Sequence, residues 1–252
     1  MSESEHEVSG YIVKDGIAYE TAQHRKLRIK RELSARMRTA NIPTDMLDYN
    51  PDVDYLGEKS LNEVLKLKKV LEWSSSTSER HVKLRELARK SMYYMYGVNG
   101  TQKTHLAWWL GKELCRNGET VYFTTMQAIL QDLTNLELNK DPDSEVYRRI
   151  QKCKNVQFLF LDESFDKSKV TIFKSNFQIP YLDDLIRSRT QSNKANFFIS
   201  NNKYNEIEDI VGKSIQDFVY RNVTIAKTNM VFEDIYINNL DRYKGQSLIS
   251  LF

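Results

Sequence analysis

A chain of 252 residues can hold one large domain, or a small module followed by a larger one. Hydrophobic residues make up 40% and charged residues 28%, which is typical of a globular protein, and a net charge of +3 does not indicate a partner by itself. Two cysteines exclude a disulfide framework. Neither a membrane-length apolar run nor a charged-then-apolar leader is present, so we expect a reducing, cytoplasmic setting without membrane association.

The N-terminal part predicts a small module. Residues 1–9 are polar and acidic, and we expect a disordered tail there. Gly10–Glu20 predicts a β-hairpin, and Ala22–Thr39 predicts a basic helix. The segment 24–38 is rich in Lys and Arg and holds a single Glu, which indicates either a surface for nucleic acid or an acidic partner, or a solvated helix face. Residues 44–59 look irregular, so the module and its linker are expected to span 10–59.

Helical and strand patterns then alternate from residue 60 to about 240, which predicts an α/β domain with a mainly parallel sheet, followed by a tail at 241–252. The expected helices are Leu61–Trp73, Arg80–Lys90, Lys103 to Asn117-Gly118, Met126–Leu136, Ser144–Cys153, Tyr181–Gln191, Tyr204–Ile210 and Ser214–Val219. The expected strands are Tyr93–Tyr96, Thr120–Thr124, Val156–Leu161, Ala195–Ser200 and two short strands between Val223 and Ile237. In such sheets ligands bind at the carboxyl ends of the strands.

A glycine-bearing loop follows the strand Tyr93–Tyr96 and leads into an apolar helix. Strand, loop, Lys103-Thr104 and helix come in the order of a phosphate-binding P-loop. Lys103 would reach the β- and γ-phosphates, and the Thr104 hydroxyl would bind Mg²⁺. The residues expected to bind the nucleotide are Gly97, Asn99, Gly100, Thr101, Gln102, Lys103, Thr104 and His105. The alternative is an ordinary strand-turn-helix with a lysine in the turn.

Gln102 departs from the P-loop pattern, which has glycine at this position. A residue with a Cβ is handicapped if the backbone must take a positive φ or lie against the phosphates. Gln102 therefore leaves ATP binding as the expectation and puts ATP hydrolysis in question.

Polar residues end two further strands. Asp162 follows a buried strand and would hold Mg²⁺, and Glu163 would orient the water that attacks the γ-phosphate. Asn201 could contact the γ-phosphate or that water. The alternatives are an Asp-Glu pair that merely ends a strand, and an asparagine that caps a helix. Candidates for an arginine supplied by a neighbouring subunit are Arg187, Arg189 and Arg221.

With these residues in place, the chain resembles the DnaC/DnaI helicase-loader and IstB-like branch of the AAA+ ATPases. Four blocks carry the resemblance in order: residues 97–133, 158–163, 182–202 and 207–223. It implies a P-loop AAA+ core that binds ATP, Mg²⁺ and single-stranded DNA, and that associates with copies of itself. It also implies an N-terminal module that binds the replicative helicase during the initiation of DNA replication. The divergence of the sequence favours a phage or mobile-element origin, in a bacterial cytoplasm or an infected host.

The chain departs from this family at three places. Gln102 replaces a loop glycine, and Ser214 and Phe218 stand where arginines are expected, which leaves Arg221 as a displaced candidate for the catalytic arginine. Thr21 and His24 stand where the family often has zinc-binding cysteines, and no cysteine precedes Cys115, so we expect no zinc.

Two surface segments have candidate roles through the resemblance. The insertion at 164–180 would contact single-stranded DNA through Lys167, Lys169, Phe173, Lys174 and Phe177, or would be a surface helix with a few buried aromatic residues. Gln246–Phe252 resembles the sliding-clamp-binding peptide of bacterial replication proteins, or is a terminal strand packed on the body. Other functions compatible with the sequence are a nucleotide-binding adaptor that does not hydrolyse ATP, and an IstB-like transposition regulator that prefers duplex DNA.

Overall fold

The computed structural model describes residues 6–8, 10–14, 17–51, 79–97, 99–100, 102–138, 141–166, 178–203, 206–227 and 235–237. Several predicted features lie outside these ranges. They are the helix Leu61–Trp73, the loop residue Thr101, the insertion residues 167–177 and the C-terminal tail 241–252.

A six-stranded sheet, in the order β5-β6-β7-β4-β8-β9, forms the centre of the described residues. Its strands are β4 (Met92–Tyr96), β5 (Val121–Thr125), β6 (Phe158–Asp162), β7 (Ala195–Ser200), β8 (Val223–Lys227) and β9 (Ile235–Ile237). All neighbours pair in parallel except β8 and β9. The predicted strands and the mainly parallel sheet are therefore confirmed. The carboxyl ends of β4, β6 and β7 lie along one edge, where the polar residues of the sequence patterns follow.

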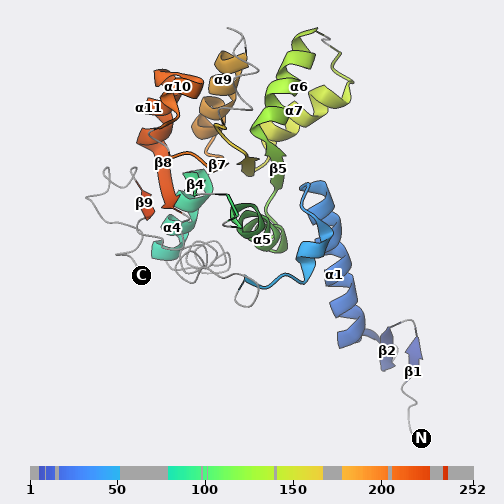
Figure 1. Ribbon diagram of the computed structural model, residues 1–252. Coiled ribbons are helices and arrows are strands. Elements are labelled where there is room, and N and C mark those ends of the chain that lie inside the picture. The colour runs from blue at the N-terminus through green and yellow to red at the C-terminus, as the bar shows by residue number, and fades with distance from the viewer. Residues whose placement is uncertain are drawn as a thin grey trace, which may run out of the picture.

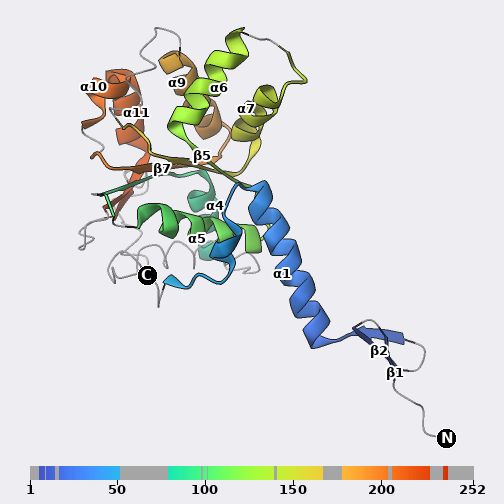
Figure 2. The ribbon, with the colours of Figure 1, turned by 45° about the vertical axis from the view of Figure 1, so that its right-hand side comes forward.

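Helices cover both faces of this sheet (Figures 1 and 2). One face carries α4 (Glu79–Lys90) and α5 (Lys103–Arg116). The other carries α6 (Met126–Leu138), α7 (Glu145–Asn155), α9 (Gln178–Gln191), α10 (Glu208–Val211) and α11 (Lys213–Asn222). The helices predicted over these ranges are confirmed, with ends that shift by a few residues.

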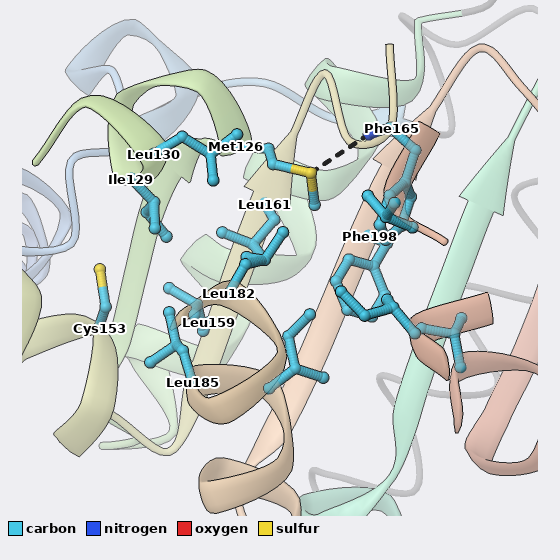
Figure 3. Packing of buried hydrophobic residues seen from close by; sticks show 14 of the residues in the cluster. Met126, Ile129, Leu130, Cys153, Leu159, Leu161, Phe165, Leu182, Leu185 and Phe198 are labelled. Carbon is cyan, nitrogen blue, oxygen red and sulfur yellow. Dashed lines mark hydrogen bonds between the residues drawn. The ribbon is translucent and has the colours of Figure 1, made fainter. Parts of the chain in front are cut away.

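The alternation of side chains along each strand explains the two cores. Tyr93 and Met95 pack on the α5 side, whereas Met92 and Tyr94 pack on the α9 side, because successive residues of a strand point to opposite faces. Strand β6 divides in the same way and is buried on both faces, as its unbroken apolar run predicts. Figure 3 shows the second core, where α6 and α9 close over Leu159 and Leu161.

The N-terminal module is an arm that leads away from this body (Figure 2). It consists of β1 (His6–Val8), β2 (Tyr11–Lys14), β3 (Ile17–Glu20) and α1 (Ala22–Thr39). The predicted hairpin and helix are confirmed. The predicted disorder over residues 1–9 is wrong for His6–Val8, which pairs antiparallel with β2. So short a polar strand has no hydrophobic pattern of its own, and the open edge of β2 decides its conformation.

The C-terminal half of α1 joins the arm to the body. Leu33 and Met37 are buried with the α5 residues of the first core, while residues 25–32 of α1 are exposed. After α1, the Ala40 carbonyl accepts from the Phe123 N–H at 2.8 Å, and Asn41 Nδ2 donates to the Phe123 carbonyl at 3.0 Å. These bonds cover the open edge of β5, which removes an exposed strand edge.

The sequence predicts an irregular segment over residues 44–59, and this prediction is wrong for its first four residues. Thr44–Leu47 forms the 3₁₀ helix η1, and the buried Lys112 of α5 donates to the carbonyls of Met46 and Tyr49, both at 2.8 Å. Because a buried ammonium needs acceptors, this lysine fixes the segment to α5. A contact between residues more than sixty positions apart has no signature in the local sequence pattern.

Candidate nucleotide-binding site

The loop after β4 places Lys103 at the carboxyl edge of the sheet. Gly97 N–H donates to the Ser200 carbonyl at 3.3 Å, which ties the start of the loop to β7. Lys103 is the first residue of α5, and its Nζ donates to the Gly97 carbonyl at 2.9 Å. The ammonium is thus held across the loop, at the N-terminus of a helix whose unpaired N–H groups favour anions.

Gln102 takes the backbone conformation that makes glycine the usual residue here. Its φ of 57° and ψ of 24° are left-handed, and its side chain makes no capping hydrogen bond to α5. The concern raised by the sequence is therefore confirmed as a matter of geometry, since a left-handed residue with a Cβ costs about 1–2 kcal/mol. The side chain is exposed and lies at the rim of the pocket, so it does not fill the loop.

The side chains of Thr104, in the first turn of α5, and Asp162, at the end of β6, contact each other. Thr104 Oγ1 donates to Asp162 Oδ2 at 2.9 Å, and the Glu163 N–H donates to Asp162 Oδ1 at 2.8 Å. A hydroxyl and a carboxylate at this spacing fit Mg²⁺, which takes one or two protein ligands and completes its shell with water and phosphate oxygens. The side chains predicted to hold Mg²⁺ are therefore adjacent, and they would be its protein ligands.

A pocket of about 450 Å³ opens at this edge. Its lining residues are Asn99, Gly100, Gln102, Lys103, Thr104, His105, Asp162, Glu163, Ile199, Ser200 and Asn201. Residues predicted from three separate stretches of the chain thus converge on one cavity. Ile199 and Ser200 were not predicted, although their place at the end of β7, directly before Asn201, is the signal that could have identified them.

The electrostatics of the pocket suit a polyanion. Burial lowers the pKa of Lys103 from its ordinary 10.5, and the nearby carboxylate of Asp162 opposes this shift. A phosphate beside this lysine would favour its charged form and relieve the cost of its burial.

His105, at the outer rim, packs edge-on against Trp108 with ring centres 5.2 Å apart, and its ring centre lies 6.3 Å from that of Tyr49. Of these three rings, that of His105 belongs to the lining of the pocket.

The candidate arginines lie apart from the pocket. Arg189 is 1% exposed and donates to buried acceptors, so it cannot reach a neighbouring subunit. Arg187 donates to Ser214 Oγ at 3.0 Å, and its guanidinium lies 4.3 Å from the centre of the Phe218 ring. Arg221 is exposed at the end of α11, two residues before Val223, which pairs with Met92 at the amino edge. It therefore lies at the edge opposite to the pocket of its own subunit.

Among the described residues, no group of three or more His, Cys, Asp or Glu is placed to hold a metal ion. No helix in the described part of the chain is long and apolar enough to cross a membrane.

Comparison with known proteins gives the family. The profile described as "IstB-like ATP binding protein" matches residues 13–169, which is 157 of the 252 residues. No protein of curated function matches significantly in sequence.

Solved structures match at low sequence identity. The DnaC helicase loader has 16% identity and a TM-score of 0.55, over 74% of this chain and 100% of that chain. DnaI has 14% identity and a TM-score of 0.55, over 75% and 95%. The replication initiator DnaA bound to AMPPCP and single-stranded DNA has 16% identity and a TM-score of 0.54, over 72% of this chain and 50% of that chain. At such identities these matches show the fold, and the predicted P-loop AAA+ core is confirmed.

Proposed function

Since the chain belongs to the IstB-like ATP-binding family, we propose that it is an ATPase that helps to load a replicative helicase onto single-stranded DNA. One observation carries this proposal. Lys103, Thr104, Asp162, Glu163 and Asn201, from three separate stretches of the chain, line a single pocket of about 450 Å³ at the carboxyl edge of the sheet. Cation, hydroxyl, two carboxylates and an amide are the groups that ATP hydrolysis needs, whereas a binding module needs no base beside the metal ligands.

Each side chain has a distinct role in this proposal. Lys103 would contact the β- and γ-phosphates, and Thr104 and Asp162 would hold Mg²⁺, which neutralises the charge that develops on the phosphates. Glu163 would accept a hydrogen bond from the attacking water and orient it in line with the γ-phosphorus. Asn201 would contact the γ-phosphate without adding charge. Residues 97–105 would surround the phosphates with backbone N–H groups.

The substitution Glu163→Gln tests the enzyme. Steady-state ATP hydrolysis should fall at least about 50-fold while ATP affinity stays within about threefold, since the amide keeps the size of the side chain and removes the base. Glu208→Gln, an exposed change on α10, is the control and should leave the rate unchanged. Single-stranded DNA should raise the wild-type rate. ATP binding without turnover would instead favour the non-hydrolysing adaptor, for which the left-handed Gln102 is the specific observation.

A neighbouring subunit would supply Arg221. Because Arg221 lies at the edge of the sheet opposite to its own pocket, it could act only on nucleotide held by another copy. Arg221→Ala should then lower hydrolysis without lowering ATP affinity. A mixture of Arg221→Ala with Glu163→Gln should recover activity, because some pockets then combine an intact Glu163 with an intact arginine. Arg187→Ala is the comparison, and a larger loss there would move the role to Arg187.

The arm would bind the helicase. Four large apolar side chains are about half exposed on it: Ile17 56%, Tyr19 52%, Leu27 47% and Ile29 48%. Exposed apolar side chains with charged neighbours, here Arg25, Lys26 and Arg31, are typical of a protein-binding surface. The double substitution Ile17→Ser, Tyr19→Ser should abolish capture of a replicative helicase and leave ATP hydrolysis intact. Failure of the wild-type chain to capture helicase, together with stable duplex binding, would favour the transposition regulator.

Two further contacts belong to the same proposal. Residues 164–180 would contact single-stranded DNA, and replacing Lys167, Lys169 and Lys174 by Ala should weaken binding of an oligonucleotide and lower its salt dependence.

Gln246–Phe252 would bind a sliding clamp. A synthetic peptide of these residues should compete with the whole chain for the clamp, and a peptide lacking Leu251 and Phe252 should not.

A further inference from the structure

The turn that follows Asp162 holds two residues in an unfavourable backbone conformation. Glu163 has a φ of 51° and Phe165 a φ of 57°, and neither is glycine. Each left-handed residue with a side chain is strained, and such strain persists only where the surroundings hold it. Because Glu163 lines the pocket, the conformation of this turn decides where its carboxylate lies.

The residue between them is tied to the neighbouring strand. Ser164 is fully buried; its N–H donates to the Ile199 carbonyl at 2.8 Å, and its carbonyl accepts from Ser200 Oγ at 2.6 Å. The Ser164 hydroxyl donates back to the Leu161 carbonyl at 2.6 Å. The turn that carries Glu163 is therefore fixed to the end of β7 on both sides of Ser164.

The same hydroxyl also holds the segment that carries Asn201. Ser200 Oγ accepts from the Asn202 N–H at 3.1 Å while it donates to the Ser164 carbonyl. Asn202 Nδ2 donates to the Phe165 carbonyl, and the Asn202 carbonyl accepts from the Tyr94 hydroxyl at 3.0 Å. Glu163 and Asn201 are thus each flanked by residues that meet at one buried oxygen, Ser200 Oγ.

Apolar side chains of the second core also hold the turn in place. Phe165 is fully buried, lies 5.2 Å from the ring of Phe198, and its N–H approaches Met126 Sδ at 3.4 Å (Figure 3). Burial of this ring offsets part of the strain of the left-handed backbone. The packing holds Phe165 in place, and the hydrogen bonds through Ser200 and Asn202 connect the turn to the segment that carries Asn201.

We propose that Ser200 is a positioning residue, whose buried hydroxyl sets the distance between the Glu163 carboxylate and the Asn201 amide around the γ-phosphate. This inference rests on the proposed nucleotide site. Its consequence is specific: loss of the hydroxyl should impair recognition of the γ-phosphate and hydrolysis, and should spare the contacts to the α- and β-phosphates, which come from the loop before α5.

The test compares ATP and ADP affinities with Mg²⁺ in a Glu163→Gln background, where ATP is not consumed. With Ser200 intact, ATP should bind at least about fivefold more tightly than ADP, the worth of one polar contact. Adding Ser200→Ala should lower the ratio of ATP affinity to ADP affinity to about two or less, with ADP affinity unchanged. Adding Ser188→Ala is the control, because this serine also donates to a backbone carbonyl, that of Leu185 at 3.1 Å, within α9. It should leave the ratio intact.

The possible outcomes distinguish a failure of the positioning role of Ser200 from a failure of the proposed nucleotide site. An unchanged ratio in the Ser200→Ala protein, or equal ATP and ADP affinities with Ser200 intact, would overturn the positioning role while nucleotide binding stands. A uniform loss of both affinities would assign Ser200 to folding alone. No binding of either nucleotide to the wild-type chain would instead overturn the proposed function. Asn202→Ala, which removes the bond to Phe165 but keeps the Ser200 hydroxyl, supplies a second variant and should lower the ratio by about half as much on a logarithmic scale.

Discussion

Two buried cations lie at opposite edges of the same sheet and have different roles. Arg189, near the amino edge, is surrounded by acceptors: the carbonyls of Cys153 at 2.5 Å, Val156 at 2.9 Å and Ala195 at 2.7 Å, and Asn196 Oδ1 at 2.7 Å. Lys103, at the carboxyl edge, donates to the Gly97 carbonyl and lines an open pocket. Burial lowers the pKa of both, that of Arg189 to about 10.

The difference is in how each charge is compensated. The acceptors of Arg189 belong to the protein itself, so its contribution goes into the stability of the fold. Lys103 stands beside space for a ligand, so much of its compensation would come from a bound phosphate. The same sheet therefore has one edge that is closed and static, and another that is strained, polar and open.

The largest expected effect is on the closed edge. Arg189→Met should lower the free energy of unfolding by about 3 kcal/mol, because it leaves several buried carbonyls without a donor. Urea unfolding measures this change, and Arg148→Met, an exposed arginine of α7, should stay within about 0.5 kcal/mol. The nucleotide affinity of the folded Arg189→Met protein should equal that of the wild type. A stable Arg189→Met protein would contradict the structural role.

The second effect is on the open edge. Lys103→Met should lower ATP affinity about 100-fold, equivalent to about 2.7 kcal/mol, because the phosphates lose their charged partner. It should leave the free energy of unfolding within about 1 kcal/mol of the wild type, since removal of a buried charge offsets the loss of its hydrogen bond to the Gly97 carbonyl. Displacement of a fluorescent nucleotide measures the affinity, with the exposed Lys90→Met of α4 as the control. A large loss of stability with little loss of affinity would reverse the comparison.

A smaller effect concerns the strain of the open edge. Gln102→Gly should tighten ATP binding about threefold to fivefold, because glycine takes the left-handed conformation without the cost of a Cβ. The matched control is Asn193→Gly, an exposed residue with a φ of 55° at the turn after α9. It should change stability in the same direction and leave ATP affinity unaltered. Weaker binding by Gln102→Gly would show that the glutamine side chain contributes to the site.

The smallest effect is on pH dependence. Since the pKa of Lys103 is lowered in the folded chain, the unfolded chain binds more protons between that lowered value and 10.5. The stability of the wild type, measured relative to Lys103→Met, should therefore rise as pH increases through this window. Unfolding of both proteins in urea at several pH values measures the difference. A difference that falls with pH would contradict the burial of a charged lysine.

Local patterns predicted most of the fold, because its strands and helices carry strong apolar periodicity and glycine or asparagine at their ends. The helix after Lys103 ends at Arg116, with Asn117 as its C-cap and Gly118 at a φ of 84°, as expected. Most of the pocket residues could be predicted because they lie at or just after the end of a parallel strand. Thr101 and the tail 241–252 lie outside the described residues, so their roles stay predictions.

The contacts that the patterns missed are all long-range. Arg189 reads as an exposed helix residue and was a candidate for reaching another subunit, yet it is buried by strands and helices distant in sequence. Lys112 was missed for the same reason, since its partners are set by packing rather than by neighbours in the chain. Long polar side chains satisfied by distant carbonyls have no local sequence signal.

The proposed function depends on a magnesium–nucleotide pocket that Lys103, Thr104 and Asp162 would form in spite of Gln102. Calorimetric titration of the folded wild-type chain with ATP and Mg²⁺, supported by equilibrium dialysis, tests it most directly. We expect one nucleotide to bind per chain, with affinity lost in Lys103→Met. Absence of ATP and ADP uptake by a correctly folded chain, with magnesium present, would contradict it.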